Sequence, residues 1–431
     1  MFEQVEILIR NGHVHVDTLT LSVNNRRRSP RGNHPIIDEK AFPLVKDEQQ
    51  PSVSATDTVE MLRRAVAKFP HSWDAHFQLG MCLRRDREMG ASTRHLAKAA
   101  ELVPADHPQA PVVHTCLGVN LLQTGNYALG WGEYEWRLRG PVAEHDGKFE
   151  NSASRWQGEP APNQILLLHY EQGLGDTINF CRYLKYPLML GSKIVLFCQP
   201  PLRRLMAQSY GNMIYVLPHD TLPRVPLRAS LLSLPYLLQP RIGSQIPMET
   251  PYLAAAPEDI ERLRQRIDGL ATGRGRLGLV WRGNPHNPTD GIRSIAPNQL
   301  RGLLSLNADF FVVQPDAKVE ELRELGFANV HSLAADIQDF ADTAAALTVL
   351  DGLISVDTSV VHLAGALDRP AWLLLSFPSD WRWGLEGDTT KWYPSLRLFR
   401  RQPEEGWERP LAQLNAALVQ WLAARQPSVL G

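Results

Sequence analysis

The sequence predicts an α/β protein with two parallel-sheet halves, preceded by an all-α module. Two stretches in the last two-thirds of the chain alternate short apolar runs with glycine turns and amphipathic segments, a pattern typical of strands buried on both faces. Ahead of them, a residue pattern recurs after 34 positions. With 431 residues the chain is longer than one hydrophobic core usually organises. We therefore expect several domains.

Composition narrows the class of protein. Hydrophobic residues make up 44% of the chain and charged residues 21%, and the formal net charge is -1. No overall field attracts nucleic acid, so we predict no nucleic-acid partner. The four cysteines form no Cys-x-x-Cys pair, and no window approaches the ~20 apolar residues of a membrane span. These features predict a cytoplasmic protein without a transmembrane segment.

Residues 1–54 form the predicted leader, which we expect to be partly disordered. It mixes weak alternation of apolar residues with the basic run Arg26–Arg28 and Arg31. Such a run can contact phosphates, but its composition favours a solvated linker.

Residues 55–150 contain the repeat. Leu62, Ala65 and Pro70 recur 34 residues later as Leu96, Ala99 and Pro104. This period is that of tetratricopeptide repeats, which are helical hairpins. Gly80 and Gly118 occupy related positions, where a small residue lets two helices approach closely. A structural brace and a peptide-binding surface are equally compatible with about two and a half repeats.

The two halves follow as residues 151–272 and 273–404. The first has strands at Ile165–His169 and Lys193–Phe197, separated by a glycine turn and an amphipathic segment. In the second, apolar runs begin at Leu277, Phe310, Gly352 and Ala371. Residues 254–275 read as a charged helix and a hinge, and residues 405–431 as a C-terminal helix that packs back on the first half.

The glycine turn Glu171–Asp176 lies between a strand and a helix. Glycines at such a place let a ligand approach backbone amides at a helix N-terminus. No third small residue follows at the spacing of a dinucleotide fingerprint, so NAD is disfavoured. Asp176 alone would read as a helix cap.

A second polar motif, Asp357 to His362, also joins a strand to a helix. The hydroxyls of Thr358 and Ser359 and the free amides of a helix start suit a diphosphate, with His362 one turn further on. Arg293 lies upstream, shortly after a turn that contains Asn284, and could neutralise a leaving diphosphate.

Together, Gly-Leu-Gly-Asp ending at Asp176 and the motif from Asp357 to Pro370 resemble the heptosyltransferase-related family of GT-B glycosyltransferases. With the repeats, the chain is similar to bacterial tetratricopeptide-containing members. The resemblance implies a GT-B fold, with two Rossmann-like domains facing a cleft. It implies Asp176 as general base and donor binding by Asp357, Thr358 and His362. Departures are Ser359 in place of a usual glycine, and Arg293 in place of a lysine-bearing loop.

The resemblance and the local motifs define the rest of the predicted site. We assign Asn284 and Ser359 to donor binding as well. The acceptor side of the cleft is assigned to Gln172, Gly173, Gly175, Asp380 and Trp381. The resemblance implies no cofactor and no metal, with a nucleotide-diphosphate sugar as co-substrate. The acidic pair Asp339 and Asp342 precedes a helix and favours capping over metal ligation. The aromatic residues after Trp381 favour packing between the domains over stacking on a ligand.

The favoured function is therefore an inverting transferase of hexosyl or heptosyl groups, with a protein or peptide acceptor recruited by the repeats. A glycan or lipid acceptor is the alternative substrate. A repeat-based adaptor that binds a nucleotide sugar without turnover is the alternative from another class. An epimerase of the same fold would need a second carboxylate, for which the sequence offers no clear candidate.

Overall fold

The computed structural model describes residues 7–10, 13–16, 55–140, 153–285, 290–314 and 319–425. The chain forms two compact units, Met1–His145 and Asp146–Gly431. Within the predicted leader, strands β1 (Ile7–Arg10) and β2 (His13–Val16) pair antiparallel. The rest of the leader, including its arginine run, lies outside the described residues.

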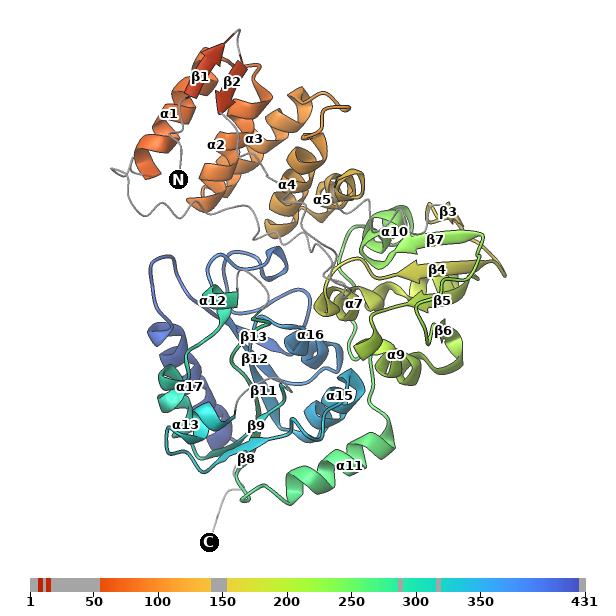
Figure 1. The fold of residues 1–431 in the computed structure, drawn as a ribbon, viewed down its shortest axis with the longest axis vertical. Helices are drawn as coiled ribbons and strands as arrows, with labels where there is room; N and C mark the ends of the chain where they lie inside the picture. The colour runs from red at the N-terminus through yellow and green to blue at the C-terminus, as the bar shows by residue number, and fades with distance from the viewer. Residues whose placement is uncertain are drawn as a thin grey trace, which may run out of the picture. The chain divides into compact units, whose positions relative to one another are not determined.

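Residues 55–140 of the first unit are helical (Figure 1). The close helix approaches predicted at two glycines are confirmed. A Cβ atom on Gly80 would lie 2.8 Å from Leu96 Cγ, and one on Gly118 would lie 2.6 Å from the nitrogen of Tyr134. The assignment to tetratricopeptide repeats stays a prediction. The helices are α1 (Ala55–Lys68), α2 (Trp73–Arg85), α3 (Met89–Leu102), α4 (Ala110–Gln123), α5 (Tyr127–Tyr134) and the 3-10 turn η1 (Glu135–Arg139).

The first half of the second unit, residues 153–256, has a five-stranded parallel sheet of order β3-β7-β4-β5-β6. Its strands are β3 (Ser154–Arg155), β4 (Ile165–His169), β5 (Lys193–Phe197), β6 (Ile214–Val216) and β7 (Leu227–Ser230). Its helices are α7 (Leu174–Phe180), continued by the 3-10 turn η2 (Cys181–Tyr183), α8 (Lys185–Met189), α9 (Arg203–Tyr210) and α10 (Leu234–Ile242). The strand order reverses between β4 and β7.

The second half, residues 275–425, has a six-stranded parallel sheet of order β10-β9-β8-β11-β12-β13. The order is that of the dinucleotide-binding Rossmann sheet, and it reverses between β8 and β11. The strands are β8 (Gly275–Val280), β9 (Ala308–Val312), β10 (Val330–Ser332), β11 (Gly352–Val356), β12 (Ala371–Leu375) and β13 (Leu396–Arg400). The predicted α/β architecture of two parallel-sheet halves is confirmed.

Helices cover both faces of this second sheet (Figure 1). They are α12 (Asp290–Arg293), α13 (Arg301–Leu304), α14 (Glu320–Arg323), α15 (Phe340–Val349), α16 (Ser359–Ala366) and α17 (Glu408–Ala423), with the 3-10 turn η7 (Trp381–Trp383). The expectation that the C-terminal helix packs back on the first half is wrong. Leu414 and Leu418 of α17 lie in the core of the second half with Leu277 and Phe310, because that sheet face offers an apolar surface.

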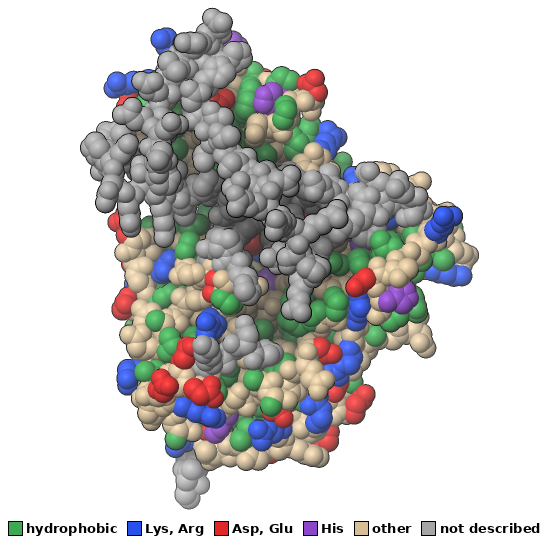
Figure 2. Space-filling view, in the orientation of Figure 1, with side chains coloured by type: hydrophobic (Ala, Val, Ile, Leu, Met, Phe, Trp, Pro, Cys, Tyr) green, Lys and Arg blue, Asp and Glu red, His purple; other side chains and the backbone are tan. Residues whose placement is uncertain are grey.

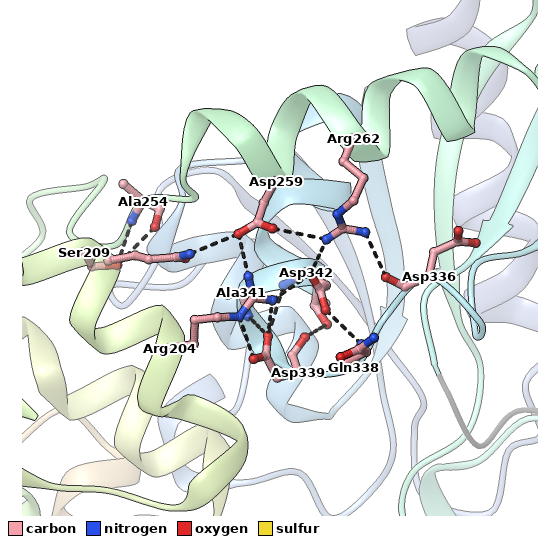
Figure 3. Close-up of polar contacts among 12 residues, drawn as sticks. Arg204, Ser209, Ala254, Asp259, Arg262, Asp336, Gln338, Asp339, Ala341 and Asp342 are labelled. Carbon is pink, nitrogen blue, oxygen red and sulfur yellow. Dashed lines mark hydrogen bonds and ion pairs between the residues drawn. The ribbon is translucent and has the colours of Figure 1, made fainter. Parts of the chain in front are cut away.

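Helix α11 (Pro257–Asp268) links the halves and is charged, as predicted. Arg204 of α9 forms hydrogen bonds both to α11 and to the second half (Figure 3). Arg204 donates to both Asp339 oxygens at 2.7 Å, to Asp342 at 2.6 Å and to Asp259 of α11 at 2.6 Å. Arg262 of α11 also donates to Asp342. We call these five side chains the Arg204 cluster.

The described residues carry both positive and negative side chains on the surface, in keeping with the formal net charge of -1. Figure 2 shows basic and acidic side chains interspersed over the visible face of the second unit. None of the helices described combines the length and the hydropathy required to cross a bilayer.

We expect Arg204→Met to lower the free energy of unfolding by about 1 to 3 kcal/mol, because charge-assisted bonds to three carboxylates are lost. Urea titration of the whole chain measures this effect. Arg264→Met is the matched control, since Arg264 makes an exposed ion pair with Glu261 on α11. Equal losses in both variants would show that the Arg204 cluster does not join the halves.

Candidate functional site

Both predicted motifs lie where the strand order of a sheet reverses. The glycine turn follows β4, and Ser230 at the end of the neighbouring strand β7 donates to Glu171 of that turn at 2.6 Å. In the second half, Asn284 follows β8 and Asp357 follows the neighbouring strand β11. Ligands of open parallel sheets bind at the carboxyl ends of strands, at such reversal points. The topology therefore places each motif where a ligand site is expected.

The two motifs also contact each other, because α7 of the first half packs against α16 of the second. Gly175 makes this approach possible. A Cβ atom at this position would lie 2.9 Å from Cδ2 of His362 and 3.6 Å from Cα of Ser359. Such a distance is too short for any side chain larger than hydrogen. The structure therefore brings the two sequence motifs into one site. We call the surrounding contact, formed by residues 174–182 with residues 359–366 and 380–393, the seam.

Asp176 has two different partners. Its Oδ2 accepts a hydrogen bond from the backbone nitrogen of Gly173 at 2.8 Å, in the manner of a capping box. Its Oδ1 accepts from Nη2 of Arg382, which belongs to the second half. A carboxylate can accept about four hydrogen bonds, so Asp176 can accept further donors. Burial is the largest influence on the pKa of Asp176 and raises it. The charge of Arg382 lowers this pKa, and the charge of Asp380 raises it. The net result is a pKa above the usual value of an aspartate.

His362 is buried in the seam and is neutral at physiological pH. Burial, followed by the positive charge of Arg382, lowers its pKa to about 3. Its ring stacks on Trp383 at a centroid distance of 5.1 Å, and its Nδ1 bonds to the hydroxyl of Tyr393 at 2.9 Å. That hydroxyl accepts from Asn179 of α7 at 2.7 Å. The Tyr393 hydroxyl can in turn donate to Nδ1, and in that arrangement the ring hydrogen of His362 is on Nε2.

Arg293 connects helix α12 to the end of strand β11. Its Nε lies 3.3 Å from Asp290, and its Nη1 donates to the backbone oxygen of Asp357 at 3.3 Å. Ser294 donates to Asp290 at 2.8 Å and accepts from the nitrogen of Gly283 at 3.0 Å. The guanidinium is therefore held beside the β11 motif, while the nearby Asn284 is exposed.

The remaining predicted site residues differ in exposure. Gln172, Gly173, Thr358, Ser359 and Asp380 are partly exposed, and Asp357 is 8% exposed. Trp381 is 1% exposed and packs edge-on against Trp392. Its ring presents almost no surface to a ligand in this arrangement, so its contact with an acceptor stays a prediction.

The predicted packing role of the late aromatic residues is confirmed. Trp381, Trp383, Trp392 and Tyr393 are all buried in the second unit. Trp392 meets Phe180 of the first half at a centroid distance of 5.8 Å. These rings therefore form much of the seam.

Sequence reasoning missed the two arginines of the seam. Arg382 is part of Asp-Trp-Arg-Trp, from which only Asp380 and Trp381 were predicted as individual site residues. Arg182 is 3% exposed, donates to the backbone oxygens of Pro247 and Trp392 at 2.9 Å, and lies 4.8 Å from the ring centre of Tyr393. The aromatic setting of Arg382 was a usable signal, since arginine stacks well on aromatic rings. Arg182 has no such signal in the sequence.

The predicted cap at Asp339 is confirmed. Its carboxylate accepts from the backbone nitrogens of Ala341 and Asp342 at the start of α15. Among the residues that the structure describes, no three histidine, cysteine, aspartate or glutamate side chains are grouped to hold a metal ion.

Comparisons with known proteins find similar chains, among them the following three. Protein FlbA of Caulobacter vibrioides is 24% identical over 330 residues, which are 70% of this chain and 54% of the relative. The chain thus spans about half the length of this curated relative. A family 9 glycosyl transferase of Veillonella parvula matches 62% of this chain and 98% of its own, with 12% identity and a TM-score of 0.43. Heptosyltransferase WaaC of E. coli, with ADP-2-deoxy-2-fluoro heptose, matches 60% and 99%, with 14% identity and a TM-score of 0.39. No family model matches the chain.

We expect His362 to make folding sensitive to acid. Its pKa is about 3 in the folded chain and 6.5 when unperturbed, so the unfolded chain binds more protons between these values. The stability due to the neutral ring is complete above pH 6.5 and is lost as pH falls, by about 1 kcal/mol near pH 5.5. Urea titration of His362→Asn should show a smaller loss than the wild type over this range. Parallel curves for both proteins would contradict the burial of a neutral ring.

Proposed function

We propose that the chain is an inverting, metal-independent glycosyltransferase that moves a sugar from a nucleoside-diphosphate donor to an acceptor hydroxyl. One observation carries the proposal. The contact of Gly175 with His362 and Ser359 puts a partly buried carboxylate of one half beside a diphosphate-compatible strand end of the other. Both motifs also stand at the reversal points of their sheets.

In the proposed reaction, Asp176 is the general base. It takes the proton from the acceptor hydroxyl, whose oxygen forms a bond to the anomeric carbon of the donor sugar. The bond from that carbon to the diphosphate breaks, and its electron pair stays on the phosphate oxygen. A pKa above the ordinary value of a carboxyl suits a base that works near neutral pH.

The second half supplies the groups for the leaving diphosphate. The backbone amides at the start of α16 and the hydroxyls of Thr358 and Ser359 donate to phosphate oxygens. Arg293 adds a positive charge from across the β8–β11 reversal. His362 donates through Nε2 as a neutral ring, so its contribution is a hydrogen bond without charge. We assign Asp357 and Asn284 to the same donor site.

For the acceptor, we propose a protein or peptide segment bound by the helices of the first unit. A partly exposed aromatic group lies on these helices. Trp136 stacks on His114 at 3.9 Å and under the guanidinium of Arg139 at 4.1 Å, while Trp73 contacts His107 at 4.9 Å. Rings and a cation of this kind bind extended peptides well. Four cysteines without a disulfide fit a reducing, cytoplasmic setting.

We expect two variants to separate turnover from binding. Asp176→Asn retains an acceptor for the Gly173 amide, so it should bind nucleotide normally while turnover falls by roughly 10² to 10⁴. Arg293→Ala should instead weaken binding by about 1 to 3 kcal/mol. Calorimetry with ADP, GDP and UDP measures binding. Hydrolysis of ADP-heptose, GDP-mannose and UDP-N-acetylglucosamine measures turnover.

Asp388→Asn and Arg397→Ala are the matched controls, because these two residues form an exposed ion pair with each other. Turnover of Asp176→Asn within a few-fold of the wild type would reduce Asp176 to a helix cap. A wild type that binds nucleotide but hydrolyses none of the sugar nucleotides would favour the adaptor.

We expect Trp136→Leu and Arg139→Ala to reduce sugar transfer to protein acceptors in a cell lysate about tenfold, with donor hydrolysis unchanged, because lost ring and cation contacts are worth about 1 kcal/mol each. Leu129→Ala is the control, since this side chain is 62% exposed on α5. Equal transfer by all variants would make the helical unit a structural brace.

A further inference from the structure

Among the contacts described above, the second half reaches the carboxylate of Asp176 through the side chain of Arg382. The arginine side chain is 6% exposed, and its three nitrogens bond to three different residues. Nη2 bonds to Asp176, Nη1 lies 3.1 Å and 3.2 Å from the two oxygens of Asp380, and Nε lies 3.4 Å from Oδ1 of Asn179. The guanidinium also lies over the rings of Trp381 at 4.5 Å and Phe180 at 5.4 Å.

We propose that Arg382 is a positioning residue that keeps Asp176 ionised and oriented from across the seam, so that the base is complete only when the two halves are packed together. This inference rests on the proposed function and names the group that prepares its base. Arg382 acts through Asp176 and is not assigned a contact with substrate.

The charges that face Asp176 show why it needs a cation. Burial favours the neutral acid, and two other carboxylates do the same: Asp380 from the η7 segment and Glu171 from the turn after β4. Only Arg382 and the Gly173 amide oppose them among the causes that shift its pKa. The neighbouring ring of His362 is neutral. Without the guanidinium, Asp176 would bind a proton and lose its function as a base.

Asp380 limits the effect of the arginine. Because Nη1 is bound by both Asp380 oxygens, Asp176 receives only part of the positive charge. A carboxylate with its own dedicated arginine would be a weak base, since its pKa would fall. The three-residue group therefore keeps Asp176 ionised without making it too weak to accept a proton.

The pairing also connects base strength to the packing of the halves. Asp176 and Asn179 are on α7, whereas Arg382 and Asp380 follow β12 in the second half. The bond from Asn179 to Tyr393 and the close contact at Gly175 hold these two segments together. If the seam opens, Asp176 loses its cation and its burial together, so its pKa returns toward the ordinary value and the bond that orients it is broken.

The first test needs no substrate and uses the full chain. In Arg382→Met, the buried Asp176 has a raised pKa, so the folded state binds more protons than the unfolded state. That contribution to stability is present at low pH and is lost as pH rises. The drop in unfolding temperature relative to the wild type should therefore grow from about pH 5 to about pH 8. The double variant D176N/R382M should remove the growth above about pH 6.5, where His362 is neutral in both the folded and the unfolded chain, and Arg397→Met, an exposed arginine, should show no drop.

The second test measures the base. We expect the acid limb of the pH profile for sugar-nucleotide hydrolysis to move to higher pH in Arg382→Met, so that the ratio of rates at about pH 6 and about pH 8 falls about tenfold. Arg382→Lys retains a cation and should recover part of the ratio. Gly175→Ala keeps both charged groups but crowds the His362 ring where α7 meets α16. Because a looser seam exposes Asp176 to water, the limb should move in the opposite direction, to lower pH.

The outcomes separate the two proposals. A pH-independent loss of stability in Arg382→Met, unaffected by D176N, would show that Arg382 only packs the seam and would overturn the inference. An unshifted acid limb in Gly175→Ala would overturn the dependence on packing. If the wild type hydrolyses no sugar nucleotide, the proposed function fails, while the unfolding experiment still decides whether Arg382 keeps Asp176 ionised.

Discussion

Helix α7 of the first half can approach helix α16 of the second because residue 175 has no side chain. A Cβ atom there would be 2.9 Å from the ring of His362, so a larger residue would displace that ring or the helices. The bond between Asn179 and Tyr393 and the pair of Arg382 with Asp176 both require this approach. The glycine therefore lets the polar groups of the two halves meet without displacing the His362 ring.

The seam combines buried polar side chains with buried aromatic rings. Arg182, Arg382 and Asn179 are buried there with aromatic rings around them. Buried polar groups are costly unless their bonding is satisfied, and satisfied networks favour one arrangement over similar ones. Most bonds of these three side chains cross the seam or reach backbone oxygens next to it. The network thus opposes sliding of one half on the other more strongly than an apolar contact of similar area.

The sequence was informative where structure is local. Apolar runs identified strands β4 and β8, and the glycine turn was placed correctly before α7 because it depends on neighbouring residues only. The pair of Asp176 and Arg382 spans 206 positions, and no local pattern specifies such a partner. For the same reason α17 was placed on the wrong half, since its apolar stripe fits any apolar surface. The role of Arg182 could not be predicted, because an isolated arginine in an amphipathic segment is normally expected to be solvated.

Helix α11 has charged contacts toward both halves within a few turns. Asp259 accepts from Arg204 of the first half at 2.6 Å, while Arg266 donates to Asp336 of the second half at 3.1 Å. Helix α11 therefore forms specific ion pairs with each of the two halves. Anyone who builds hybrid proteins by exchanging one half with that of a relative must transfer the matching charges of α9, α11 and α15 together. A junction placed anywhere within residues 257–268 would separate partners that were selected as a set.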